Sequence, residues 1–291
     1  MKIIKYFFEF IAVISLFCFF KIIGLYNASN MGSVLGKSIG PFFRSKNITK
    51  KNIETAFGKI DKIQEDKIIK GMWSNIGRTF SEYPFLKNLK FKKISSNYIK
   101  INGIEFLEKI KKNNEPVIFY SGHFANFEIM AMELNKYGIK LAAIYRPLNN
   151  FFLNPLMEYL RMKYICPHQI PKGRMGMREI VEKIKNNFSI ALMVDQRVSE
   201  GPRSNFFNKP AHTTTVPAQL AMKYGCKLVP IYIERKENVN FEMTIYEPYK
   251  IQKTDDNDKD TKNITLRINK DIEKMIIKNP TQWIWSHNRW K

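Results

Sequence analysis

The stretch that decides the fold is Val117-Ile118-Phe119-Tyr120-Ser121-Gly122-His123-Phe124-Ala125-Asn126-Phe127-Glu128. An apolar run, a glycine and then apolar residues at helical spacing predict a buried strand, a tight turn and a helix. His123 then lies in the turn, and Glu128 lies in the first turn of the helix. Residues five apart on one continuous helix would diverge by about 140°, so the pair can meet only in this strand–turn–helix arrangement.

Strand and helix patterns alternate after this stretch. The short apolar runs that predict buried strands cover residues 117–120, 141–145, 190–194 and 228–233. The segments with helical spacing cover residues 124–137, 155–162, 176–185 and 216–224. Residues 242–246 are expected to add an edge strand, and residues 264–277 a final helix. Such alternation is typical of an α/β fold in which helices flank a mostly parallel central sheet.

Three chemically active side chains follow three of the predicted strands. His123 comes after the first strand, Arg146 after the second and Asp195 after the third. Ligands of open α/β sheets bind outside the carboxyl ends of the strands, so these residues are expected at one site. Asp195 has an alternative role as the start of a turn, because aspartate favours turn positions.

His123 and Glu128 are the candidate catalytic pair. A neutral imidazole can take a proton from a hydroxyl when a carboxylate holds the opposite ring nitrogen in its protonated form. No serine or cysteine is needed if the hydroxyl belongs to the substrate. The alternative is that His123 only caps the helix, while Glu128 is a solvated first-turn acid stabilised by the helix dipole.

Composition narrows the class of protein. The chain has 291 residues, 44% of them hydrophobic, which is enough to bury a substantial core. Its 48 Lys and Arg against 26 Asp and Glu give a net charge of +22. This charge favours nucleic acid, an anionic lipid surface, a phosphorylated substrate or an acidic carrier protein as partner. Zinc-finger spacing, a basic zipper and RNP-type aromatic motifs are missing from the sequence, so nucleic acid is not expected.

The cysteines and histidines indicate no metal site. Cys18, Cys166 and Cys226 form no CxxC pair, which indicates a reducing compartment and neither a disulfide framework nor structural zinc. An HExxH motif is also missing from the sequence, so metal-dependent hydrolysis is not indicated.

The N-terminus predicts a membrane anchor. Residues 6–26 are almost wholly apolar, interrupted by Glu9 and Lys21, and about 20 such residues can cross a bilayer as a helix. The alternatives are an interfacial amphipathic helix and a cleaved signal peptide. A basic flank follows the apolar run and favours a cytoplasmic position for the rest of the chain; it consists of Lys37, Arg44, Lys46, Lys50 and Lys51. We expect an anchor over residues 1–30 and one domain over 31–291, with a leading helical part, 31–112, and an α/β catalytic part, 113–291.

Two C-terminal segments have simpler interpretations. Residues 250–262 form a polar run of mixed charge, which predicts an exposed loop. Residues 279–290 contain Trp283, Trp285 and Trp290 with basic neighbours. These tryptophans are expected to pack against the sheet; a position at a membrane interface is the alternative.

The order of the motifs resembles a known family. A histidine followed after four residues by Asp or Glu, behind a buried strand, resembles the signature of the lysophospholipid-type glycerolipid acyltransferases. The Glu form, HFANFE at 123–128, resembles the late acyltransferases of lipid A biosynthesis, the lauroyl and myristoyl transferases. The segments that match that family in order are YRPLNN (145–150), the turn at 172–178, DQR (195–197), GPRSNFFNKPAHTTT (201–215) and the tryptophan-rich ending. FPEGTRS-like text, found in acyltransferases of glycerol phosphate, is missing here, which argues against such an acceptor.

The resemblance implies a function and a set of site residues. It implies transfer of a fatty acyl group from acyl carrier protein to a hydroxyl of a lipid A precursor, with His123 as base and Glu128 as its orienting carboxylate. Arg146 and Arg174 are expected to bind phosphate, since guanidinium groups pair with it through planar hydrogen bonds. The remaining substrate-binding candidates are Asp195 and Arg203.

The same resemblance implies where the protein works and what it needs. We expect no metal or organic cofactor, because a thioester already carries an activated acyl group. The expected location is the cytoplasmic side of the bacterial inner membrane, on its anionic leaflet. Three alternatives stay open, namely another glycolipid or phospholipid acceptor, a thioesterase that uses water, and a basic membrane protein without enzymatic activity.

Overall fold

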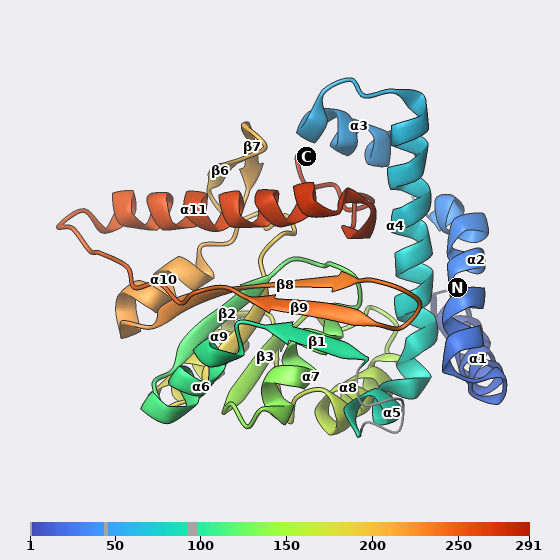
Figure 1. Cartoon of the computed structure of the whole chain (residues 1–291), viewed down its shortest axis with the longest axis horizontal. Helices are drawn as coiled ribbons and strands as arrows, with labels where there is room; N and C mark the ends of the chain where they lie inside the picture. The colour runs from blue at the N-terminus through green and yellow to red at the C-terminus, as the bar shows by residue number, and fades with distance from the viewer. Residues whose placement is uncertain (1, 44–45, 92–97) are drawn as a thin grey trace.

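A seven-stranded sheet forms the centre of the part of the chain described by the computed structural model, residues 2–43, 46–91 and 98–291 (Figure 1). Arg44, part of the predicted basic flank, lies outside these residues. The strand order is β1-β9-β8-β2-β5-β3-β4. The strands are β1 (Ile99–Asn102), β2 (Val117–Ser121), β3 (Leu141–Tyr145), β4 (His168–Pro171), β5 (Ser189–Met193), β8 (Lys227–Arg235) and β9 (Phe241–Ile245). A separate antiparallel hairpin consists of β6 (Arg203–Phe206) and β7 (Lys209–His212).

The sheet confirms the predicted α/β class. Strand β2 is buried along its whole length and pairs in parallel with β5 and β8. Only the β8–β9 pairing is antiparallel among the sheet's ladders in the described residues. The strand predicted over residues 242–246 is present as β9, but its predicted edge position was wrong, because β1 pairs in parallel with β9 and covers it. With four residues and a mixed burial pattern, β1 gives too weak a signal to find in the sequence.

Alternate residues of the central strands point into two separate cores. Val117 and Phe119 of β2 point into a core shared with α6 (Ile104–Asn113), α7 (Glu128–Lys136) and α8 (Asn154–Tyr164). Ile118 and Tyr120 point into the opposite core, shared with α9 (Arg174–Lys185), α10 (Val216–Tyr224) and α11 (Asn257–Lys278). A strand buried on both faces is therefore apolar without interruption, as the sequence pattern required.

The N-terminal region is a group of helices at the carboxyl end of the sheet. These helices are α1 (Lys2–Ile23), α2 (Leu25–Phe43), α3 (Lys46–Phe57), α4 (Lys62–Glu82) and α5 (Leu86–Lys90), with the 3₁₀ turns η1 (Tyr83–Phe85) and, near the C-terminus, η2 (Pro280–Gln282). Figure 1 shows α4 standing across the end to which β8 points, with α2 and α1 beyond it. Residue 30, the predicted end of the anchor, lies inside α2.

Small residues let α2 and α4 approach closely. A Cβ added at Gly36 would lie 2.1 Å from the carbonyl oxygen of Trp73, and one at Gly77 would lie 1.9 Å from that of Gly32. Ser33 and Ser74 add a hydroxyl–hydroxyl bond of 2.7 Å between the helices. Helix α4 is thus a rigid support whose other side faces the sheet.

Two expectations for the C-terminal third can be compared with the structure. The predicted loop at 250–262 was wrong in its second half, because α11 begins at Asn257 and the Asp256 side chain accepts from the Lys259 amide at 2.9 Å. An aspartate at this capping position stabilises a helix start, and the charge pattern alone hides it. Trp283 and Trp285 are buried, 1% and 0% exposed, which confirms packing and excludes a membrane-interface position for these two rings.

Candidate active site

The turn between β2 and α7 is braced by segments far away in sequence. Ala125 has a φ of +45°, in the left-handed region that residues with a side chain rarely adopt. Its carbonyl oxygen accepts from Asn75 Nδ2 and Thr79 Oγ1 of α4, each at 3.0 Å. Its amide donates to the Gln282 carbonyl at 3.2 Å. These three bonds fix the turn that carries His123.

His123 is held by Asp195, the second residue after the end of β5. Its Nδ1 lies 2.7 Å from Asp195 Oδ1, and its backbone amide donates to Oδ2 at 2.8 Å. Trp283 Nε1 also donates to Oδ2, at 2.8 Å. Asp195 is 1% exposed, so its charge is balanced by these donors rather than by water. The carboxyl ends of β2 and β5 thus bring together two of the residues predicted to share a site.

The two pKa shifts support a defined proton position. Burial raises the pKa of Asp195, but the neighbouring imidazole and the hydrogen bonds outweigh it and bring this pKa down to about 2. Asp195 is therefore an ionised acceptor, Nδ1 of His123 carries a proton, and Nε2 is the free basic nitrogen in the neutral ring. For His123, burial lowers the pKa, whereas the charge of Asp195 and its hydrogen bond raise it above the usual value.

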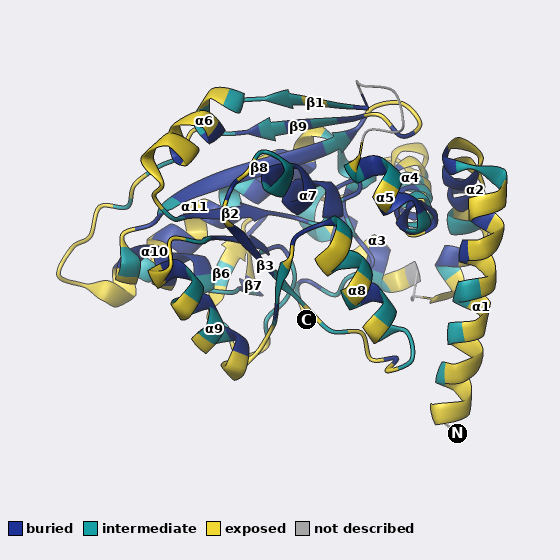
Figure 2. Ribbon diagram, turned by 90° about the horizontal axis from the view of Figure 1, so that it is seen from below, coloured by how far each residue is buried: buried dark blue, intermediate teal, exposed yellow. Residues whose placement is uncertain are grey.

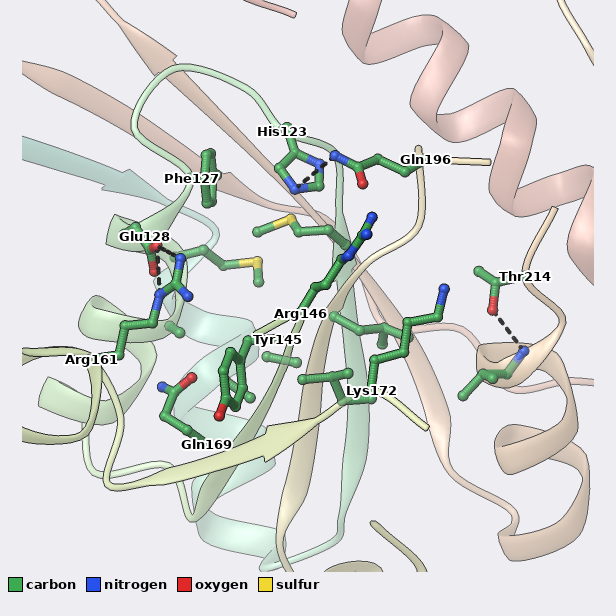
Figure 3. Close-up of a pocket in the computed structure, with 18 of the residues that line it drawn as sticks. His123, Phe127, Glu128, Tyr145, Arg146, Arg161, Gln169, Lys172, Gln196 and Thr214 are labelled. Atoms are coloured by element: carbon green, nitrogen blue, oxygen red, sulfur yellow. Dashed lines mark hydrogen bonds and ion pairs between the residues drawn. The ribbon is translucent and has the colours of Figure 1, made fainter. Parts of the chain in front are cut away.

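Glu128 contacts different partners from those expected. Its Oε1 accepts from Arg161 Nη2 at 2.7 Å and Nε at 3.0 Å, and from the hydroxyl of Tyr83. The ring of Phe127 packs edge-on against His123 with centroids 4.8 Å apart, and Figure 3 shows it between His123 and Glu128. The expectation that Glu128 holds the imidazole nitrogen is corrected, since Asp195 occupies Nδ1. The turn directs the side chains of His123 and Glu128 apart. Nδ1 of His123 instead contacts Asp195, which lies 72 positions later in the sequence.

A cavity of about 370 Å³ opens beside the imidazole. His123 and Gln196 line it together, and the Gln196 amide nitrogen lies 3.5 Å from His123 Nε2. In Figure 3 Arg146 extends towards the same space. The apolar part of the lining includes Ala131, Ala143, Ile165, Ala191 and Met193, and the cationic part includes Arg146, Arg161, Lys172 and Arg197. A cavity with this combination suits an amphiphile that has an anionic head.

A second, smaller cavity of about 200 Å³ also borders the imidazole of His123. Its lining is largely apolar and includes Thr79, Phe80, Tyr83 and Trp283. His123 and Phe127 line both cavities. The imidazole therefore borders two cavities, and each of them could admit a ligand.

The other predicted substrate residues occupy different positions around the site. Arg146 follows β3 and lines the larger cavity, with an exposed side chain. Arg174 is the first residue of α9, exposed, next to the cavity-lining Gly173. Arg203 is exposed on β6, where it pairs across the hairpin with His212. Neither Arg174 nor Arg203 lines the cavity.

Arg161, Trp283 and Gln196 were not predicted as site residues by the sequence analysis. The sequence spacing could have pointed to Arg161, because it follows the buried Met157 by four residues and so shares the inward face of α8. A signal for the bond between Trp283 and Asp195 does not exist in the sequence, because it joins residues 88 positions apart. Among the residues that the structure describes, no group of three His, Cys, Asp or Glu is placed to hold a metal ion.

Comparison with known protein families identifies the family of this chain. The family model described as bacterial lipid A biosynthesis acyltransferase matches residues 1–291. The chain belongs to this family. The resemblance first seen in the HFANFE motif is thus confirmed, and the protein is an acyltransferase of lipid A biosynthesis.

Individual members of the family are distant in sequence. The lipid A biosynthesis palmitoleoyltransferase of Escherichia coli (strain K12) is 24% identical over 270 residues, which cover 90% of this chain and 84% of the relative. The lauroyltransferase of the same organism is 23% identical with the same coverage. The myristoyltransferase is 22% identical over 190 residues, 63% of this chain and 56% of the relative. These relatives carry names of different acyl chains, so family membership leaves the chain length open.

Proposed function

We propose that this acyltransferase moves a fatty acyl group from the thioester of acyl carrier protein to a hydroxyl of a lipid A precursor, on the cytoplasmic side of the bacterial inner membrane. The observation that carries the proposal is the contact of 2.7 Å between the buried Asp195 and His123 Nδ1, which leaves Nε2 beside the cavity. This is the arrangement that a base needs when its hydroxyl partner comes from the substrate.

The chemical step needs only the side chains of this site. Nε2 of His123 takes the proton of the acceptor hydroxyl while the hydroxyl oxygen attacks the thioester carbonyl carbon. Asp195 stabilises the imidazolium that forms, since it already holds Nδ1 at 2.7 Å. The tetrahedral intermediate collapses, the C–S bond breaks, and the imidazolium returns its proton to the leaving thiolate. The products are an ester and the thiol of the carrier.

Glu128 acts in this proposal as a positioning residue for Arg161. Two bonds from the guanidinium to Glu128 Oε1 fix the orientation of Arg161, which lines the cavity. Negative charge that develops in the transition state is stabilised more by a positive group that is already fixed in place than by a positive group that must first reorient. Glu128 thus supports catalysis through Arg161, while Asp195 supports it through His123.

Basic residues around the cavity provide contacts for the phosphates of the acceptor. Arg146, Lys172 and Arg197 line it, and guanidinium groups pair with phosphate through two parallel bonds. Arg174, at the start of α9, and the exposed Arg203 would contact the part of a ligand that extends beyond the cavity. The net charge of +22 would also attract an acidic carrier protein.

The proposal is tested by mass spectrometry of the acylated product. Membranes carrying the protein are incubated with defined acyl carrier thioesters and a tetra-acylated lipid A precursor, for the parent and for His123→Ala. His168→Ala is the matched control, because His168 is half-buried in β4 and its Nδ1 faces Lys183, away from the site. Loss of product in His123→Ala alone is expected. Undiminished transfer by that variant would defeat the mechanism, and release of free fatty acid without ester would indicate a thioesterase.

A further inference from the structure

The first half of α1 is attached to the segment that joins β3 to α8. Asn150, in that segment, donates through Nδ2 to the Tyr6 carbonyl at 2.9 Å and to Glu9 Oε2 at 3.1 Å. Phe151 and Phe152 pack edge-on against α1. The ring centroid of Phe151 lies 5.9 Å from that of Tyr6, and the centroid of Phe152 lies 5.7 Å from that of Phe7. Asn150 is 8% exposed, so this is a built contact rather than a surface collision.

The second half of α1 is attached to the domain as well. Phe17 and Phe20 are buried, and the ring of Phe17 lies 5.2 Å from that of Phe80 of α4. A helix of this length extends over about 33 Å, and it is held near both of its ends. The helix therefore lies along the domain with one face against protein and the other outward (Figure 2).

The outward face is apolar and continues onto the attached segment. The exposed apolar side chains of α1 are Ile3, Ile4, Phe7, Phe8, Ile11, Leu16, Phe19 and Ile22. Leu148 and Phe151 of the segment are 38% and 51% exposed. Among the described helices, only α1 is long and apolar enough to cross a membrane, and most of its residues are exposed. Contiguous exposed apolar surface of this kind marks a site of contact with another phase or partner.

We propose that the outward face of α1 and the residues Leu148 and Phe151 form one surface that lies in the headgroup region of a phospholipid bilayer. In this arrangement α1 lies in the plane of the membrane beside the domain. A transverse α1 would carry its attached partners, Asn150 and Glu9, to the depth of the hydrocarbon, where polar and charged groups are costly. A helix that lies in the interface avoids this cost, because Asn150 and Glu9 then stay at the level of the headgroups and water.

The charges next to this surface fit an anionic leaflet. Lys2 and Lys5 are exposed at the start of α1, and Arg146 is exposed two residues before Leu148. Basic residues beside an apolar interfacial surface add attraction to anionic lipid headgroups. A lipid bilayer fits both properties of the surface, whereas a protein partner would need a matching apolar groove.

The same segment connects the membrane surface to the cavity. It begins at Arg146, which lines the cavity, and its Leu148 amide donates to Asn154 Oδ1 at 2.7 Å, which ties it to the start of α8. If the proposed function holds, a lipid acceptor in the same leaflet reaches the cationic lining without leaving the membrane. This consequence rests on the proposed function, whereas the membrane contact itself does not.

Site-specific fluorescence measures the membrane contact independently of acyl transfer. A nitrobenzoxadiazole label is placed at Phe8→Cys, Phe151→Cys or Leu266→Cys in the Cys18→Ser chain. Burial raises the pKa of the remaining thiols, Cys166 and Cys226, to about 11, so they react slowly with the label. Leu266, on α11, is 37% exposed and serves as the control away from the surface. The labelled proteins are mixed with vesicles of phosphatidylethanolamine and phosphatidylglycerol.

The proposal requires the labels at 8 and 151 to lie at the same shallow depth. Vesicles should then protect both from aqueous iodide severalfold, with strong quenching by headgroup nitroxides, while the label at 266 stays open to iodide. Equal iodide quenching at 151 and 266 would overturn the proposal. So would a label at 8 that is quenched mainly by nitroxides at the bilayer centre, which is the result for a transverse helix.

A matched pair of variants tests the consequence for the acceptor. Leu148→Asp and Leu266→Asp replace leucines of nearly equal exposure, 38% and 37%. Leu148→Asp should lower transfer to an acceptor embedded in vesicles severalfold and leave transfer in detergent micelles unchanged, and Leu266→Asp should change neither. Equal rates for the two variants in vesicles would refute the coupling even if the labels report membrane contact.

Discussion

His123 and Asp195 make two hydrogen bonds to each other across the ends of β2 and β5. One joins Nδ1 to Oδ1 at 2.7 Å and the other joins the His123 amide to Oδ2 at 2.8 Å. The pair fixes the position of the ring, its rotation and its tautomer at once. The unprotonated Nε2 is left beside a cavity whose basic lining suits the phosphates expected on a lipid A precursor.

The pH dependence of the rate should report the titration of His123. The pKa of its ring is raised, because Asp195 outweighs the effect of burial. The base is the neutral ring, so kcat/KM should increase with pH through a midpoint above 6.5 and then reach a plateau. Measurement of kcat/KM from pH 5 to pH 9 checks this. A rate that is independent of pH between 5 and 8 would mean that no group with this pKa takes the proton.

Glu128 and Arg161 should be coupled in stability. Their side chains are 9% and 13% exposed, so removal of one leaves the other buried without its charge partner. Glu128→Gln and Arg161→Met are each expected to lower the free energy of unfolding by about 3 kcal/mol. The double variant should lose less stability than the two single variants together, and the difference should exceed about 1 kcal/mol. Urea denaturation of the four proteins measures this coupling, and additive losses would show that the pair contributes nothing.

Arg146 should affect recognition of phosphate rather than the chemical step. Arg146→Ala is expected to raise KM for a phosphorylated acceptor about tenfold or more, since a charge-assisted bidentate contact is lost, with little change in kcat. Arg146→Lys should restore only part of the affinity, because lysine cannot form the paired contact. With an acceptor that lacks its phosphates, parent and variant should show the same KM. A tenfold difference there would place Arg146 in another role.

The close packing of α2 on α4 should be sensitive to a single methyl group. A Cβ at Gly36 would lie 2.1 Å from the Trp73 carbonyl oxygen, so Gly36→Ala forces the helices apart. We expect a loss of about 1–3 kcal/mol in the free energy of unfolding. Ser38→Ala, at an exposed position of the same helix, is the control and should change stability by less than about 0.5 kcal/mol. Equal stability of the two variants would show that the helices separate without cost.

The sequence predicted the elements that local patterns determine. Strand β3 and helix α10 begin and end where expected, because a buried strand is a continuous apolar run and a helix has a regular period. The common position of His123 and Asp195 also followed from the rule that parallel strands end at one edge. Strand β1 was missed, since four residues with mixed burial give no clear period.

The pairing of side chains within the site could not be predicted in the same way. His123 and Glu128 are close in sequence, which suggested a dyad, whereas the contact observed at Nδ1 comes from another strand. The direction of each side chain depends on the left-handed backbone at Ala125, which α4 and Gln282 hold in place. Nothing in the local sequence shows these distant bonds.

The most direct test of the account is the single-turnover rate constant of Asp195→Asn, compared with that of Glu128→Gln at the same pH. Asp195→Asn keeps the size of the side chain but removes the charge that stabilises the imidazolium, so the rate constant should fall by about 10²-fold to 10⁴-fold with little change in acceptor affinity. The rate constant of Glu128→Gln should fall less, because Asp195 still holds His123 in that variant. A parent-like rate constant in Asp195→Asn, with activity abolished in Glu128→Gln, would contradict the account and return the orienting role to Glu128.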